Sequence, residues 1–184
     1  MADLYVESRH AAPGAQYRDR EEFLQRVADS VRRPGFDMVI AESASLAGYC
    51  FGYPLDRNGR WWDALIGPLP EDVERLTASG HVFTIVETVI RSHEHDNGLT
   101  SRLHQRLLAN SHASLGATLT HHADPLNATL HAAGWRTLGE FRTTPGLTTL
   151  HVLILPIGTR TADNPDGLAH NAQTQRPEEA NENA

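Results

Sequence analysis

The sequence predicts an α/β fold of the α+β kind, with a mixed, mostly antiparallel sheet of about six strands and helices on both faces. Three observations lead to this fold class. Short apolar segments typical of strands alternate with segments whose apolar residues recur at helical spacing. Their order is helix, two strands, short helix, strand, helix, strand, helix, two strands. The length of 184 residues suits one domain with a sizeable core.

The first third of the chain predicts a helix and a hairpin. Asp19 can cap a helix whose apolar face includes Phe23 and Val27, and a Pro-Gly pair stops it. Residues 36–42 and 46–54 have the apolar character of strands and flank a short turn that contains serine. We expect them to pair as an antiparallel hairpin.

The middle of the chain predicts a short helix and a central strand. The segment 60–69 does not distinguish helix from strand. Pro70 suits the first turn of a short helix that runs through Leu76. Residues 81–90 are β-branched and almost continuously apolar, which is typical of a strand that is buried on both faces.

The last part of the chain predicts two helices and three strands. They are a helix from Gly98 to about Ser111, a strand at 116–121, a short helix ending at Gly134, and strands at 135–141 and 148–156. Strands 81–90 and 116–121 are joined through a helix. We therefore expect them to be parallel neighbours with a right-handed crossover.

Composition indicates a soluble protein of the cytoplasm. The chain is 40% hydrophobic and 21% charged, and no apolar run approaches the length of a membrane span. The N-terminus lacks the basic and apolar regions of a secretory signal. From Gly158 the chain turns polar, so we expect a domain at 1–157 and a disordered, acidic tail at 158–184.

Residue usage excludes several classes of function. The single cysteine, Cys50, excludes an internal disulfide and a thiolate-rich zinc site. The net charge of −7 argues against a nucleic-acid partner. All 16 basic residues are arginines, so mechanisms that need a lysine are excluded. The pairs His93/His95 and His121/His122 lack accompanying acidic ligands, and we predict no metal.

A polar loop with one glycine joins the 81–90 strand to the long helix. Its spacing is His95-x-x-Gly98-x-Thr100. Glycine lets the backbone approach a ligand closely, and the N–H groups from Asn97 to Ser101 can converge on the oxygens of a phosphate at the helix N-terminus. Arg102 can add a charge-assisted contact. Taken alone, the loop also fits a plain polar turn.

Together these segments resemble the GNAT (GCN5-related N-acetyltransferase) superfamily. In that family a Gln/Arg-x-x-Gly-x-Gly/Ala motif follows the fourth strand and binds acetyl-CoA. The resemblance covers most of residues 20–157, and the LYVES…RPGFDMV opening looks like actinobacterial small-molecule members. It implies a sheet splayed at its centre, acetyl-CoA as acyl donor and a small primary amine as acceptor, with no membrane partner.

The resemblance also implies a set of site residues. The cofactor-binding residues would be Val89, Ile90 and Arg91 along the pantetheine arm, and His95, Asp96, Asn97, Gly98, Leu99, Thr100, Ser101 and Arg102 around the pyrophosphate. Acetyl transfer needs a neutral amine, so a base must take its proton, directly or through water. Glu87 is an acid within an otherwise apolar strand and is our candidate base. A surface carboxylate, or one paired with an arginine, is the alternative. His121, at a strand end, is a second base or a substrate contact.

Four positions depart from the family pattern. His95 and Thr100 replace the usual residues of the motif, and Leu130 stands where a tyrosine usually protonates the leaving thiolate. The family's first strand is missing or compressed into residues 1–10, which would leave a sheet edge open. Two alternatives therefore stay open: a GNAT fold that binds acyl-CoA without turnover, and a protein–protein module that forms a homodimer through that edge.

Overall fold

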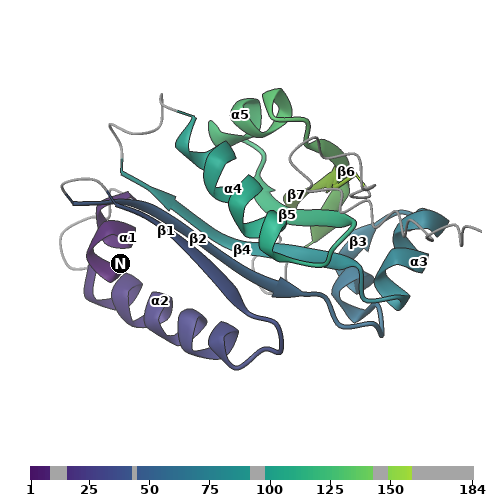
Figure 1. The fold of residues 1–184 in the computed structure, drawn as a ribbon, viewed down its shortest axis with the longest axis horizontal. Helices are drawn as coiled ribbons and strands as arrows, with labels where there is room; N and C mark the ends of the chain where they lie inside the picture. Colours follow the sequence, from purple (N-terminus) through teal and green to yellow (C-terminus); the bar gives the residue numbers. More distant parts are fainter. Residues whose placement is uncertain (9–15, 43–44, 92–97, 143–148, 159–184) are drawn as a thin grey trace, which may run out of the picture.

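The computed structural model describes residues 1–8, 16–42, 45–91, 98–142 and 149–158 (Figure 1). The helices are α1 (Ala2–Ser8), α2 (Gln16–Val31), the 3-10 helix η1 (Arg60–Ala64), α3 (Glu71–Ala78), α4 (Leu99–Asn110) and α5 (Leu126–Ala132). The strands are β1 (Asp37–Glu42), β2 (Leu46–Pro54), β3 (Leu65–Ile66), β4 (Val82–Ile90), β5 (Leu115–His121), β6 (Arg136–Arg142) and β7 (Thr149–Pro156). The tail expected after Gly158 lies outside the described residues.

The strands form one mixed sheet in the order β1-β2-β4-β5-β7-β6-β3. Only β4 and β5 pair in parallel, and every other neighbouring pair in the described sheet is antiparallel. The predicted hairpin and the predicted parallel pair are both confirmed. The sheet has seven strands rather than about six, because the ambiguous segment 60–69 supplies η1 and the two-residue β3.

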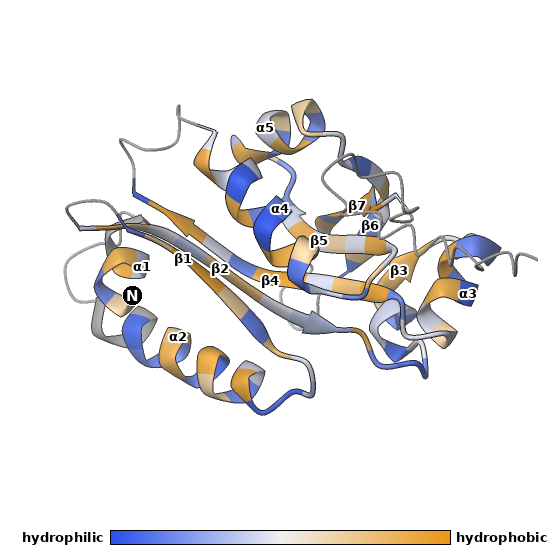
Figure 2. Ribbon diagram, viewed as in Figure 1, coloured by the Kyte–Doolittle hydropathy of each residue, from blue (hydrophilic) through white to orange (hydrophobic). Residues whose placement is uncertain are grey.

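Helices cover both faces of the sheet, as predicted. Figure 1 shows α1 and α2 on one side and α4 and α5 on the other, and we call these sides the α2 face and the α4 face. On the α4 face, Leu103 and Leu107 pack with Ile85. On the α2 face, Phe23 packs with Tyr49. Figure 2 shows the corresponding alternation of hydrophobic and hydrophilic residues along α2.

The N-terminal region differs from the prediction in one respect. α2 begins at Gln16, so Asp19 lies inside the helix and is not its cap. An aspartate suits a cap, but neither proline nor glycine lies between Gln16 and Asp19 to stop the helix from starting earlier. Residues 2–8 form a helix and not a strand, and β1 pairs only with β2 among the described strands.

Candidate functional site

β4 and β5 separate halfway along their length. Their parallel ladder runs from Val82 opposite Leu115 to Ile85 opposite Thr118. Beyond that point β4 pairs only with β2, and β5 pairs only with β7. We call the region between residues 86–90 of β4 and 119–121 of β5 the split. It leaves one edge of each central strand without a strand partner in the described sheet.

A bulge in β4 begins the split. Gly52 of β2 pairs with Ile85 and the preceding Phe51 pairs with Glu87, so Val86 is the extra residue. A Cβ atom on Gly52 would lie 2.0 Å from the carbonyl oxygen of Thr84, and only glycine allows this approach. Bulges bend the strand that contains them. Val86 is 37% exposed although β4 is a central strand.

The backbone of β4 offers alternate residues to the split. The Arg91 N–H donates to a β2 carbonyl at 2.9 Å, and the Val89 carbonyl oxygen lies against Gly48 of β2. Because the main-chain groups of successive strand residues point to opposite sides, those of Thr88 and Ile90 face the split. Of the three strand residues predicted to contact the cofactor, only Ile90 presents its backbone there.

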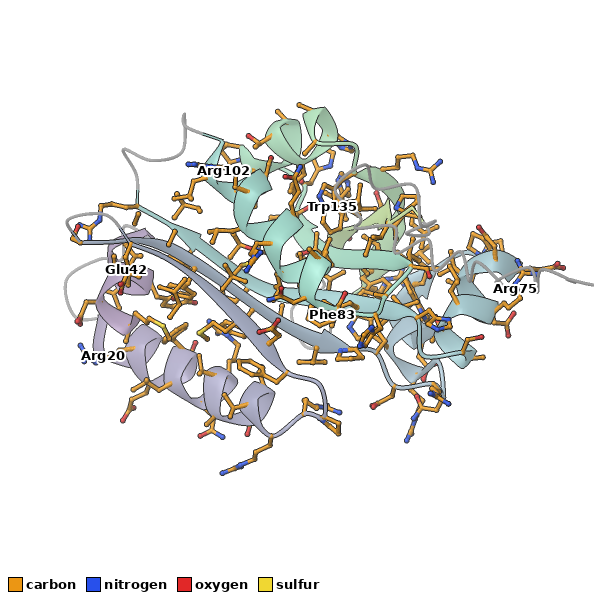
Figure 3. All side chains as sticks on the ribbon, viewed as in Figure 1. Arg20, Glu42, Arg75, Phe83, Arg102 and Trp135 are labelled. Carbon is orange, nitrogen blue, oxygen red and sulfur yellow. The ribbon has the colours of Figure 1, made fainter. Side chains whose placement is uncertain are left out.

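The first turn of α4 is suited to an anion. Gly98 precedes it with φ 64° and ψ 18°, makes no side-chain cap, and would carry a Cβ that meets nothing within 4 Å. The turn contains no acidic residue. Arg102 is exposed at this end of the helix (Figure 3). Free N–H groups and a nearby guanidinium attract phosphate oxygens.

The structure places the remaining predicted cofactor-binding residues, those of the loop and Arg91, as follows. His95, Asp96 and Asn97 lie outside the described residues. Leu99 and Thr100 are buried in the packing of α4 on the sheet, and Ser101 is half-buried. The Arg91 guanidinium donates to the Leu46 carbonyl from Nε and Nη2, at 3.1 and 3.0 Å.

Glu87 lies on the α2 face, where it meets a guanidinium. Arg26 Nη2, from α2, donates to Glu87 Oε2 at 3.2 Å and to the Tyr5 hydroxyl of α1 at 2.6 Å. The Glu87 side chain is 17% exposed. The arginine pairing considered as an alternative is therefore present.

His121 lies across the split from Glu87 and on the same face. It is exposed at the end of β5, and two residues earlier Leu119 packs in the cluster of the α2 face that contains Val82. Because side chains alternate along a strand, His121 shares that face. The structure thus brings the two predicted catalytic residues to one face, on the two strands that separate.

Position 130, where the resemblance would place a tyrosine, is occupied by a leucine that packs in the core. Leu130 is fully buried against the core of the α4 face. His131, its neighbour, lies with Nδ1 3.0 Å from the Trp135 carbonyl oxygen. Leucine has no ionisable group, so residue 130 cannot act as the acid.

Buried polar atoms border the split on the α4 face. His104 Nε2 lies 2.8 Å from Thr88 Oγ1, while His104 Nδ1 has no partner among the described residues. Burial lowers the pKa of His104 to about 4, so its imidazole is neutral. Thr120 Oγ1, on β5, is also buried and unpartnered within the described chain. Orphaned polar atoms of this kind are costly unless a ligand or water meets them.

The sequence interpretation missed Arg26, Tyr5 and His104. A signal was present in two of them. Arg26 stands three residues after Phe23 on the apolar stripe of its helix, and His104 stands beside Leu103 on the buried stripe of α4. A polar residue on an apolar stripe indicates a buried partner. The partners, Glu87 and Thr88, are distant in sequence and follow only from the fold.

Two further findings concern other classes of site. Among the described residues, no three His, Cys, Asp or Glu side chains come together in a way that would hold a metal ion. None of the helices in the described ranges has the length and apolar character of a membrane span.

The described chain has the fold of the GNAT acetyltransferases, which confirms the predicted resemblance at the level of fold. No known protein-family model matches the sequence, and no curated protein matches it. Solved structures do match. An acetyltransferase from Thermus thermophilus is 16% identical with a TM-score of 0.55, over 85% of this chain and 88% of that one.

Two other solved structures are similar over comparable lengths. A protein from Desulfovibrio desulfuricans assigned to the GNAT family is 15% identical with a TM-score of 0.54, over 84% of this chain and 91% of that one. An aminoglycoside 6'-N-acetyltransferase complexed with coenzyme A is 12% identical with a TM-score of 0.52, over 87% and 92%. At such identities the likeness is one of fold.

Proposed function

We propose that this chain is a cytoplasmic N-acetyltransferase of the small-molecule type, which transfers the acetyl group of acetyl-CoA to a primary amine. The observation that carries the proposal is the split between β4 and β5 beside the Glu87 carboxylate. Acetyltransferases with the same fold, one of them complexed with coenzyme A, support it.

The residues around the split fit an acyl-CoA. The main chain of Thr88 and Ile90 would bind its extended arm, and the first turn of α4 with Arg102 would bind its pyrophosphate. His95, Asp96 and Asn97 complete that binding loop in the proposal. Acetyl-CoA supplies an acetyl group activated as a thioester.

Glu87 is the general base of the proposed reaction. The amine loses a proton as it gains the acetyl group, and the carboxylate accepts that proton through a water molecule. Arg26 and Tyr5 hold the carboxylate in place. His121 is a second base or a contact for the acceptor. With leucine at position 130, the released thiol takes its proton from solvent or from a histidine near the site.

One observation favours a second candidate, an acyl-CoA-binding protein without turnover. Leu130 is fully buried where the family places an acid, and Glu87 has an arginine partner that also suits a purely structural ion pair. Both candidates predict binding of acetyl-CoA. Only the enzyme releases free thiol when an amine is added.

The test compares two glutamine variants over a panel of primary amines. Glu87→Gln removes the base and should lower the rate of thiol release about 100-fold or more. The control, Glu42→Gln, changes an exposed glutamate of β1 and should keep the rate of the original protein. Calorimetry with acetyl-CoA should give the same affinity for all three proteins.

The outcomes separate the candidates. Full activity in Glu87→Gln overturns the role of the base. Binding of acetyl-CoA without thiol release from any amine overturns the enzyme and favours the binding protein. Loss of acetyl-CoA binding in Glu87→Gln would mean that the residue supports the fold of the split and not the chemistry.

A further inference from the structure

Arg26 presents a guanidinium beside the proposed base. It projects from α2, and its Nη2 atom donates to both Glu87 and Tyr5. The Arg26 side chain is 39% exposed, compared with 17% for Glu87. A positive and a negative group therefore lie side by side on the α2 face, and the positive one is the more accessible.

Most of the hydrogen-bonding capacity of Arg26 is unused. A guanidinium carries five N–H donors in a fixed planar fork. Among the residues that the structure describes, its only partners are Tyr5 and Glu87, and both contact Nη2. Nη1 and Nε keep their donors. Nη1 can donate a charge-assisted hydrogen bond to the carboxylate of a ligand.

The guanidinium is held in a fixed orientation. Its Cζ lies 5.2 Å from the centroid of the Tyr5 ring. Tyr5 is buried and stacks on Phe23 with centroids 4.7 Å apart. A binding group that is already ordered loses less entropy when a ligand arrives. This order favours a recognition role over a mobile surface charge.

Apolar side chains lie beside this pair. Val86 lies next to Glu87 at the bulge and is exposed, and Phe51 opposite Glu87 is buried. A ligand on this face would therefore meet the Glu87 carboxylate, the Arg26 guanidinium and the apolar side chain of Val86, with His121 across the split. A molecule with an ammonium and a carboxylate group close together has the complementary charges.

We propose that the acceptor is an α-amino acid, whose carboxylate binds Arg26 while its amino group lies toward Glu87. This inference rests on the proposed function and narrows the acceptor from primary amines in general to amines that carry a carboxylate. Its apolar side chain would lie against Val86. Arg26 is then a specificity-determining residue in addition to a partner of the base.

The test measures a preference, not a rate. Apolar α-amino acids are each paired with the amine that lacks the carboxylate, such as phenylalanine with 2-phenylethylamine and alanine with ethylamine. The ratio of kcat/KM within a pair should favour the amino acid in the original protein. Arg26→Gln should reduce that ratio by about 10- to 100-fold, because it removes charge-assisted hydrogen bonds made only by the carboxylate.

Using a ratio removes the effect of Arg26 on Glu87, which both acceptors share. Arg32→Gln is the matched control, because Arg32 is exposed in the turn directly after the same helix and its ion pair in the described structure is with Asp29, at 3.7 Å. It should leave the ratio unchanged. Arg26→Lys keeps the positive charge but replaces the planar guanidinium with an ammonium, and should give an intermediate ratio.

Three results would overturn the inference. A kcat/KM ratio near one in the original protein means that the protein does not recognise the carboxylate. An equal loss for both members of a pair in Arg26→Gln means that Arg26 only positions Glu87, and the proposed acetyl transfer would stand. Absence of thiol release with every acceptor tested overturns the proposed function as well. If Arg26→Gln does not fold, calorimetric titration of the original protein decides between amino acid and amine.

Discussion

A buried, neutral histidine makes the folding stability of this protein decrease at acidic pH. His104 is 2% exposed and its pKa is lowered to about 4 by burial, compared with 6.5 for a free histidine. The unfolded chain takes up a proton below pH 6.5, whereas the folded chain does so only near pH 4. Its stabilising contribution is therefore complete above pH 6.5 and decreases as the pH falls toward 4, by up to about 3 kcal/mol.

Denaturant unfolding at about pH 7 and about pH 5 checks this expectation. The original protein should lose stability between the two values, and His104→Gln should lose about 1–2 kcal/mol less over the same interval. Glutamine keeps a polar partner for Thr88 and does not titrate. An identical loss in both proteins would assign the acid sensitivity to other groups.

At the scale of elements, the bulge of β4 depends on one residue of the neighbouring strand. A Cβ on Gly52 would lie 2.0 Å from the Thr84 oxygen and 2.7 Å from Phe83 Cε1. Gly52→Ala should therefore cost about 3 kcal/mol or prevent folding. Gly139→Ala is the control, because the closest atom to its Cβ would be Leu65 Cδ1 at 3.1 Å, the end of a flexible side chain. Thermal unfolding compares them, and equal losses would contradict the argument.

The sequence predicted the helices and strands better than it predicted the irregularities and contacts between them. The continuous apolar run of β4 and the leucine stripe of α4 identify both elements and their parallel crossover, because periodicity reports burial directly. The bulge at Val86 leaves no such signal, since it depends on Gly52 of another strand. Contacts between distant segments leave no local signal either, so Glu87 was a predicted site residue and Arg26 was not. The acid interrupts an apolar strand, whereas its partner is decided by how α2 packs.

At the scale of the molecule, the fold separates two tasks on the two faces of one sheet. The α4 face contains the helix N-terminus at Gly98 and the buried polar atoms of His104 and Thr120. The α2 face contains Glu87, Arg26 and His121. The split is the place where a ligand on one face can reach a group on the other, because there β4 and β5 are not hydrogen-bonded to each other. In the proposed function, acyl donor and acceptor therefore approach from opposite faces and meet at the bulge.

This arrangement predicts that acetyl-CoA stabilises the whole domain, since its proposed contacts join β4, β5 and α4. At about a hundred times its dissociation constant it should add roughly 2.7 kcal/mol to the free energy of unfolding, which raises the melting temperature of a chain of this size by about 5–10 °C. Arg102→Gln should reduce that shift, because it removes a charge beside the first turn of α4. Arg106→Gln, one turn further along the exposed side of the same helix, should keep it. No shift at millimolar acetyl-CoA, or equal shifts in both variants, would contradict the placement of the pyrophosphate at Gly98.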